Sequence, residues 1–466
     1  MGRGQLAARI GRARDALAAF AQRGMVRSIG VLVGGTVVAH AITMLAMPIT
    51  TRLFTPEDFS ALAVFASLLG ILSVACCLRF DAAVVMPEDD RDGINLFAVA
   101  MLATVATTAL VALVMLALPA SAYDLLREPS LIPYLWMLTP GVFIMGAYLA
   151  LQAWFVRQKR FRDIAQSRAG QATVAAGIQI GMGYAGIAPL GLLLGHVLNY
   201  GAGSLTLLGG MLARNRRLLA QVSWRHMVTM AKAYNRFPRY SVWEGLANGL
   251  SNSAPLIIIA AVARGPEAGH LTLALFVLQA PMALLGNAVA QVYLSEAPKA
   301  YREGRLDRYT ADVLAGLAAA GSGPLLFAAI ASPVLFGTVF GEPWVRSGVL
   351  VAWMAPWFFL QFLSSPICNA LHVTGRQRAM MIFHLLGVVV RVGGVILAGA
   401  FATDMVSEVW AISGWVFYAA YLGTILAMVG VPGGTGRNTL RRAAPSIAAG
   451  LAGGLAVVFV PRILGL

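Results

Sequence analysis

Residues 214–239, RNRRLLAQVSWRHMVTMAKAYNRFPR, are the stretch that decides how this chain is organised. The stretch carries seven Arg and Lys side chains and no Asp or Glu. Six apolar runs precede it and six follow, each about 20 residues long, which is the length of a helix that crosses a bilayer. We therefore expect a membrane protein in two halves joined by a basic linker.

The composition supports a polytopic all-α membrane protein. Hydrophobic residues make up 59% of the chain, charged residues make up 12%, and the mean hydropathy is +0.75. A soluble domain does not carry so apolar a composition. The apolar runs predict 12 or 13 transmembrane helices. Their expected limits are 28–50, 59–78, 94–118, 132–155, 169–186, 190–213, 240–263, 271–295, 311–339, 348–371, 380–401 and 408–430, with a thirteenth at 443–461.

These runs divide the chain into five expected parts. They are an N-terminal helix 1–26, an N-lobe 27–213 with spans one to six, the linker 214–239, a C-lobe 240–430 with spans seven to twelve, and a tail 431–466 that holds the possible thirteenth span.

The basic residues predict the orientation. If the N-terminus is cytoplasmic, all but six of the 35 Lys and Arg residues lie in cytoplasmic segments. Arg391 alone falls inside a span, and the five on the outer side are Arg52, Arg127, Arg264, Arg346 and Arg462. This is the distribution that the positive-inside rule describes. Because the net charge of +15 gathers on one face, anionic inner-leaflet lipids are the expected partner rather than nucleic acid.

The N-terminal segment has no evident cleavable signal and shows a helical pattern. Its apolar residues recur at three- and four-residue spacing, with arginines away from that face. A basic amphipathic helix in the membrane interface is expected, and a frayed basic tail is the alternative. The apolar positions are Leu6, Ile10, Ala13, Leu17 and Phe20.

The two halves echo each other at their first turns. TTRLFTPEDFSALAVF (50–65) leaves span one through a Pro-Glu turn, and AVARGPEAGHL (261–271) leaves span seven in the same way. Weak symmetry of this kind is typical of transporters built from parallel repeats. Chance similarity between two such turns is the alternative.

Several enzyme classes are disfavoured by what the sequence lacks. It contains no Gly-x-x-x-x-Gly-Lys-Ser/Thr loop, no His-Glu-x-x-His pair and no Gly-x-Ser-x-Gly elbow. The outer loops are short and their acidic residues do not cluster, which argues against a polysaccharide ligase or polymerase. We expect a transporter rather than an enzyme, with no cofactor and no metal.

Four stretches resemble bacterial oligosaccharide and polysaccharide flippases of the multidrug/oligosaccharidyl-lipid/polysaccharide exporter superfamily. They are MPITTRLFTPEDF (47–59), LRFDAAVVMP (78–87), FPRY (237–240) with LANGLSNSAP (246–255), and the segment 281–304. The resemblance covers roughly residues 27–430. It implies two six-helix lobes around a central cavity that opens alternately to either face.

The resemblance also implies the cargo and the partners. The cargo would be a polyprenyl-pyrophosphate-linked oligosaccharide, the repeat unit of a surface polysaccharide or lipopolysaccharide. It would move from the inner to the outer leaflet of the bacterial inner membrane, beside a polysaccharide polymerase and co-polymerase. Two relatives remain as alternatives, a peptidoglycan-precursor flippase and an ion-coupled multidrug or cation exporter. The cation exporter should bury carboxylates in its first lobe, and predicted spans one and three to six contain none.

Ionisable groups inside spans are costly, so each is a candidate for the substrate site. Arg391 in span eleven needs a diphosphate ligand or a carboxylate partner to stabilise its charge. In span seven, Glu244, Asn248 and Asn252 recur every four residues and share one helix face. That face would line the cavity or pack against another helix.

Further candidates lie at the ends of the spans. Arg79 and Asp81 close span two at the inner face, either contacting the cavity or serving as a gate and topology anchor. At the outer turn, Arg52 is expected to pair with Glu57 or Asp58 in a gate. The histidines of the spans, His40, His196 and His384, are isolated and favour packing roles over proton transfer.

Overall fold

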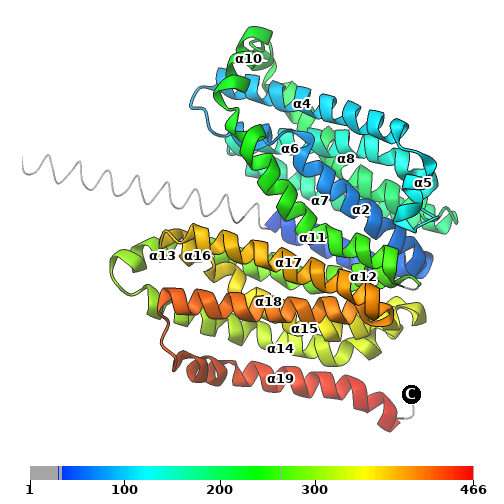
Figure 1. Ribbon diagram of the computed structural model, residues 1–466, viewed down its shortest axis with the longest axis vertical. Helices are drawn as coiled ribbons and strands as arrows, with labels where there is room; N and C mark the ends of the chain where they lie inside the picture. The colour runs from blue at the N-terminus through cyan, green and yellow to red at the C-terminus, as the bar shows by residue number, and fades with distance from the viewer. Residues whose placement is uncertain (1–29, 31–33, 264, 465–466) are drawn as a thin grey trace, which may run out of the picture.

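The computed structural model describes residues 30, 34–263 and 265–464, and the elements in these ranges are all helical (Figure 1). The first half contains a helix Gly34–Leu53, α2 Pro56–Cys76, α3 Phe80–Ala83, α4 Asp90–Ala117, α5 Ala120–Tyr123, η1 Asp124–Leu126, η2 Ile132–Met137, α6 Leu138–Arg157, α7 Phe161–Tyr184 and α8 Leu190–Arg214. The linker contains α9 Arg216–Leu219, α10 Trp224–Ala233 and η3 Phe237–Ser241. The second half contains α11 Val242–Val262, α12 Glu267–Pro281, η4 Met282–Gly286, α13 Asn287–Arg302, α14 Leu306–Phe340, η5 Glu342–Trp344, α15 Val345–Ile367, α16 Asn369–Val373, α17 Gln377–Phe401, η6 Thr403–Met405, α18 Val406–Val429 and α19 Thr435–Leu464.

The predicted class, an all-α membrane protein with many spans, is confirmed. Among the described residues, 10 helices are long and apolar enough to cross a membrane. The other three predicted spans coincide with α7, α8 and the continuous segment α12–η4–α13. The tail forms the long helix α19, whose stretch Thr435–Phe459 is long and apolar enough to be a span. The predicted amphipathic helix 1–26 lies outside the described residues.

The helices gather in two bodies that correspond to the two halves of the chain (Figure 1). In the first body α4 packs on α6, α6 on α8, and α8 on α7, around a core that contains Phe65, Trp154 and Phe155. In the second body α14 packs on α15, and α18 lies against both α15 and α17. Helix α19 runs along α14 at the far edge of this body.

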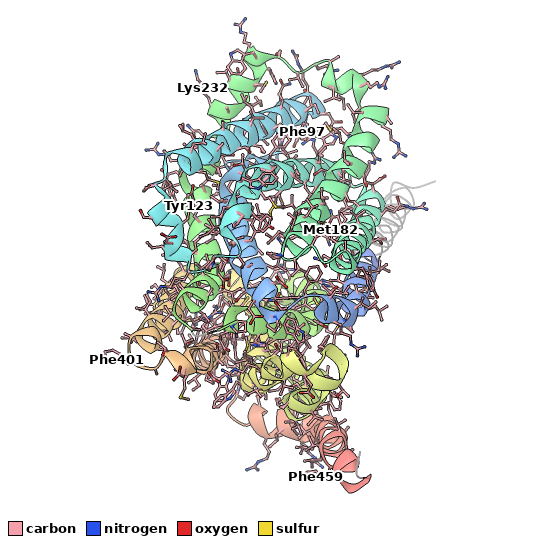
Figure 2. All side chains as sticks on the ribbon, turned by 90° about the vertical axis from the view of Figure 1, so that its right-hand side faces the viewer. Phe97, Tyr123, Met182, Lys232, Phe401 and Phe459 are labelled. Atoms are coloured by element: carbon pink, nitrogen blue, oxygen red, sulfur yellow. The ribbon has the colours of Figure 1, made fainter. Side chains whose placement is uncertain are left out.

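The basic linker is fastened to the first body at the end where α4 begins. His226 Nε2 lies 2.7 Å from Asp92 Oδ1. The Asn95 side chain, which is fully buried, donates to Gln221 O (3.3 Å) and accepts from Ser223 N (3.1 Å). Helix α10 thereby packs on α4, and Figure 2 shows Lys232 near the upper edge of the molecule. We call the helix ends on this side the linker end and the opposite ends the turn end.

At the turn end the two halves meet through the two Pro-Glu turns. Pro56 is the first residue of α2 and Pro266 precedes α12, and these two helices pack on each other. A Cβ on Gly269 would lie 1.9 Å from Pro56 O, so the close approach requires glycine. Gly269 N donates to Ser60 Oγ (3.1 Å), and Trp344 Nε1 donates to Thr51 O (2.8 Å). The turn end is therefore closed in this structure.

Candidate functional site

A polar cavity of about 390 Å³ lies inside the first half. It is lined by the helix Gly34–Leu53 together with α6, α7 and α8, and it reaches from the linker end toward the middle of the body. The lining residues are Thr36, Ala39, His40, Thr43, Tyr148, Gln152, Arg168, Gln171, Ala172, Asn199 and Tyr200. The lining thus contains amide, hydroxyl, imidazole and guanidinium groups. Residues that face lipid would be apolar instead.

A second, smaller cavity of about 130 Å³ continues the first toward the turn end. The two cavities share Thr43, Ala172 and Asn199. The second adds Thr50, Gln179 and His196 to the polar lining. Together they form a polar path through much of the depth of the first half.

Arg168 is the one cation among the lining residues, and no carboxylate lines either cavity in the part of the chain that the structure describes. Its Nη1 donates to Thr36 Oγ1 at 2.5 Å. The remaining guanidinium donors suit an anion, because the planar fork matches the oxygens of phosphate. The neutral amides and tyrosines around it can donate to and accept from sugar hydroxyls.

Close packing of α7 against α8 sets the position of this lining. A Cβ on Gly203 would lie 1.9 Å from Gln171 Nε2, so only glycine leaves room for the Gln171 side chain. Ser167 Oγ donates to Gly203 O (3.5 Å), which adds a weak bond between the two helices. The three-residue spacing of Arg168 and Gln171 then places both on the same face of α7.

Sequence analysis missed this site, and the reason is the limit that it set for span five. The expected span 169–186 left Arg168 in a cytoplasmic loop, whereas α7 begins at Phe161 and carries Arg168 two turns inside. Arg391 is therefore not the only arginine within a long helix of the transmembrane body. His40 and His196, expected as packing residues, line the two cavities, and His196 also packs between Phe65 and Tyr200.

Arg391 lies in the second half and is only 7% exposed. Its Cζ lies 4.7 Å from the ring centroid of Trp357 on α15 and 5.8 Å from that of Trp410 on α18. Its Nε has no hydrogen-bond partner, and no ion pair with Arg391 is present among the described residues. Stacking on two indoles, rather than the carboxylate considered from the sequence, stabilises this cation.

The candidates of spans two and seven meet at the linker end. Leu78 and Arg79 adopt positive φ values of 48° and 61°, which turn the chain from α2 into α3. A Cβ on Gly245 would lie 3.9 Å from Arg79 Nε, so Arg79 lies beside the first turn of α11, which carries Glu244. Arg79 Nε is buried without a hydrogen-bond partner.

The other residues of this group differ in exposure. Burial raises the pKa of the Asp81 carboxyl, and neighbouring Arg79 partly opposes that rise. Glu244 and Asn252 are exposed, and the side chain of Asn248 lies outside the described part. Arg79 and Glu244 are thus brought near each other, while the role of Asn248 stays a prediction.

The expected ion pair of Arg52 with Glu57 or Asp58 is not present in this structure. Arg52 Nη2 instead donates to Thr338 O of α14 (3.4 Å), a contact between the two halves. Asp58 Oδ2 accepts from Thr55 N (2.8 Å) and from Thr55 Oγ1, so this carboxylate caps α2. The turn end is joined by backbone acceptors and by Trp344 rather than by a salt bridge of Arg52.

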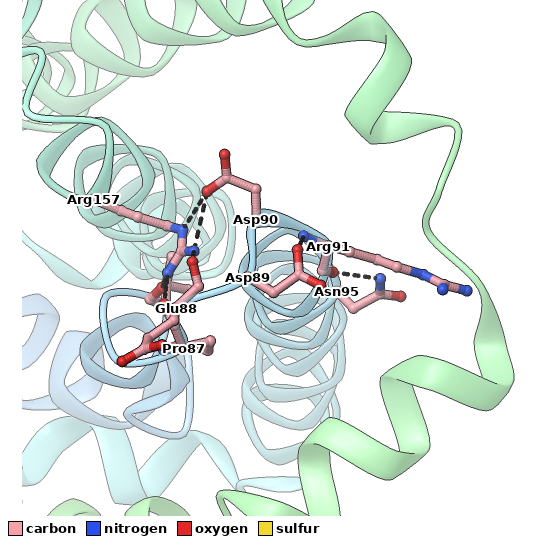
Figure 3. A network of polar contacts seen from close by, with 8 residues as sticks. Pro87, Glu88, Asp89, Asp90, Arg91, Asn95 and Arg157 are labelled. Atoms are coloured by element: carbon pink, nitrogen blue, oxygen red, sulfur yellow. Dashed lines mark hydrogen bonds and ion pairs between the residues drawn. The ribbon is translucent and has the colours of Figure 1, made fainter.

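A third arginine, Arg157, shows what a purely structural arginine looks like (Figure 3). Its side chain is 7% exposed and lies at the end of α6. It donates to Val84 O (3.2 Å), Pro87 O (2.5 Å), Glu88 O (3.2 Å) and Asp90 Oδ1 (3.0 Å). These bonds fasten the loop before α4 and leave no donor for a ligand.

The two helical bodies, with their long apolar helices, define a multi-pass membrane protein with a polar cavity. A family model described as "Polysaccharide biosynthesis protein" matches residues 49–348, and the chain belongs to this family. The resemblance to the polysaccharide flippases of the exporter superfamily is thereby confirmed. No curated protein matches the sequence.

Solved structures show the same fold. An inward-facing multidrug resistance MATE family transporter of the MOP superfamily superposes with a TM-score of 0.69 at 13% identity, covering 84% of this chain and 94% of that one. The lipid II flippase MurJ in an inward closed conformation gives 0.67 at 11% identity, covering 93% and 99%. An outward-facing MATE transporter gives 0.53 at 14% identity, covering 86% and 95%. These relatives are transporters and flippases, not enzymes.

Proposed function

We propose that this protein is a flippase that moves a polyprenyl-pyrophosphate-linked oligosaccharide across the bacterial inner membrane. The N-terminus and the linker end face the cytoplasm, in line with the concentration of Arg and Lys on that side. The saccharide enters from the cytoplasmic leaflet and leaves on the other side by alternating access of the two halves. A polysaccharide polymerase and co-polymerase would consume the product.

The observation that carries this proposal is the chemistry of the polar cavity in the first half. The cargo has a neutral polar glycan and an anionic diphosphate, and the cavity offers amides, hydroxyls and the guanidinium of Arg168. Transfer through the bilayer requires that these groups replace the water around the head group, because unpaired polar groups in hydrocarbon cost several kcal/mol.

The same cavity disfavours a cation exporter. Such a protein would need carboxylates to stabilise a positively charged cargo, and none lines either cavity among the described residues. The charge of the site matches an anion instead. The cost of burying Arg168 is offset when phosphate oxygens accept from it.

Arg391 supplies a second candidate contact for the diphosphate, in the other half. Its position between Trp357 and Trp410, without an acidic partner, leaves charge for a ligand to neutralise. Arg79, Asp81 and the face of Glu244, Asn248 and Asn252 would contact the cargo where it enters at the linker end.

Complementation of a flippase-null bacterial strain tests the proposal. Arg168→Ala should fail to restore surface polysaccharide and should accumulate the lipid-linked precursor, whereas Arg168→Lys should restore part of the activity. Arg162→Ala is the matched control, because Arg162 is an exposed residue of the same helix and lines neither cavity. Membrane abundance of each variant separates lost transport from lost folding. Full restoration by Arg168→Ala would exclude the cavity from the transport path.

A further inference from the structure

Another cavity lies elsewhere, on the far side of the second half. It has a volume of about 740 Å³ and lies between α14, α15, α18 and α19. A volume of this size is typical of sites for small organic ligands. Most of its lining is apolar, as Leu325, Phe359, Leu422 and Ile447 illustrate.

Two polar atoms stand out in this apolar lining. Ser322 Oγ and Thr439 Oγ1 are buried, and neither has a hydrogen-bond partner. Ser322 is only 8% exposed. Buried hydroxyls are normally hydrogen-bonded, so two unpaired ones, on α14 and on α19, point to a ligand with polar atoms near its apolar chain.

Positive charge gathers where the cavity reaches the linker end. The first turns of α19 line the cavity with Thr435, Gly436 and Thr439 and carry exposed Arg437 and Arg441 beside them. Arg442 differs, because its Nη1 pairs with Asp312 Oδ1 (3.1 Å) on α14. Two arginines and the positive end of a 30-residue helix therefore lie at one end of an apolar cavity.

We propose that this cavity binds an anionic phospholipid of the leaflet on the linker side, with an acyl chain between α14 and α19 and its phosphate at Arg437 and Arg441. Filling the cavity with an apolar chain is favourable in free energy, because water would hydrate the cavity poorly. The phosphate is stabilised by charge-assisted hydrogen bonds from the two guanidinium groups. The bound lipid holds α19 against the second half, where it contacts α14.

The position of the cavity favours a resident lipid over the transported one. It belongs wholly to the second half, whereas the polar cavity lies in the first. Six of its lining residues come before position 348, where the family match ends, and the other 17 follow. The site is therefore built largely from the part of the chain outside the matched family region.

Two glycines offer a clean test, because a Cβ on Gly423 or Gly436 meets nothing within 4 Å and both residues line the cavity. Gly423→Phe and Gly436→Phe should fill part of it. Gly316→Phe is the matched control, because Gly316 also has open space on α14 but does not line the cavity. Native mass spectrometry of the full protein, purified in mild detergent from membranes, measures the lipid that stays bound.

The proposal predicts a bound anionic phospholipid in the wild type and in Gly316→Phe, and its loss in the two cavity variants. Arg437→Glu and Arg441→Glu should each weaken retention about fivefold or more, since one basic residue at a membrane surface contributes about 1 kcal/mol. These charge variants leave the packing intact, so they test the site even where a phenylalanine prevents folding. Equal phospholipid retention in all variants overturns the proposal, as does cavity-dependent binding of zwitterionic lipid, of detergent only or of a lipid-linked saccharide.

Discussion

The two halves of the molecule treat a buried arginine in different ways. In the first half Arg157 donates hydrogen bonds to three carbonyl oxygens and one carboxylate. Arg168, on the wall of a polar cavity, donates to Thr36. In the second half Arg391 lies between two indole rings with its Nε unpaired. Hydrogen bonds occupy the donors of Arg157, whereas Arg391 is held by stacking and its Nε has no hydrogen-bond partner.

The difference separates structural arginines from functional ones. A guanidinium with every donor used gains nothing from a ligand, and its loss removes the bonds that fasten a loop. A guanidinium that is buried but under-satisfied is costly in the empty protein and gains when a phosphate arrives. Arg157 should therefore matter for stability, and Arg168 and Arg391 for transport.

The largest effect on stability is expected at Arg157. Arg157→Ala removes the donor to the Asp90 carboxylate and to three carbonyl oxygens, of which that of Val84 belongs to a buried residue. The loss of these charge-assisted hydrogen bonds should lower the free energy of unfolding by about 3 kcal/mol. Arg217→Ala, at an exposed linker position, is the control. Thermal unfolding of the purified variants compares them. An unchanged unfolding temperature for Arg157→Ala would contradict the structural role.

For Arg391 we expect a large effect on export and a small effect on stability. Arg391→Ala loses only the stacking on Trp357 and Trp410, at most about 2 kcal/mol, so the variant should insert and fold. Export should fall about tenfold or more, because a charge-assisted hydrogen bond contributes about 1.5–3 kcal/mol. Arg391→Lys should keep part of the activity, since a point charge replaces the planar fork.

Membrane abundance and surface polysaccharide, measured in the same flippase-null strain, separate these outcomes. Normal export by Arg391→Ala removes Arg391 from the mechanism. Low abundance together with low export would instead assign Arg391 a structural role.

The smallest expected effect is on the pH dependence of stability, and it involves Glu128 at the turn end, outside the spans. Burial raises the pKa of this carboxyl, the hydrogen bond from Ser60 opposes the rise, and the nearby charge of Glu57 adds to it. A raised pKa means that the folded state holds the proton more tightly than the unfolded state. The stability gained in acid is therefore lost as the pH rises above the ordinary pKa of 4.5.

Glu128→Gln should flatten this pH dependence, by less than about 1 kcal/mol because the group is only half-buried. Glu342→Gln, at an exposed position of the same end, should leave it unchanged. Unfolding temperatures between about pH 4 and about pH 7 measure the slope. A slope that Glu128→Gln does not change would show that other groups set the pH dependence.

Hydropathy predicted the fold well, because a span must be apolar wherever it faces lipid. It failed at the start of α7, where Arg162, Asp163 and Arg168 made a helical segment resemble a loop. A residue that lines an internal cavity has no need to be apolar, so hydropathy excludes the very positions that form a site. The three-residue spacing of Arg168 and Gln171 was the signal that could have located them.

The candidate residues show the same limit. Arg391 was recognisable as a lone charge within an apolar run, but its neighbours were not, because Trp357 and Trp410 come from two other helices. Arg52 lies at the turn end as expected, yet its partner is a carbonyl oxygen 286 residues away rather than Glu57 or Asp58, and its role as a gate stays a prediction. Long-range partners of this kind depend on the packing of the two halves, which no local pattern encodes.

Reconstitution tests the central claim most directly. Purified protein in liposomes, supplied with a polyprenyl-pyrophosphate-linked oligosaccharide in one leaflet, is assayed for the arrival of the glycan on the other side. Wild type and Arg162→Ala should equilibrate the two leaflets, and Arg168→Ala should be about tenfold slower or more, as expected for the loss of a charge-assisted contact with phosphate. Equal rates for Arg168→Ala and Arg162→Ala, or no glycan transfer by the wild type, would contradict the account.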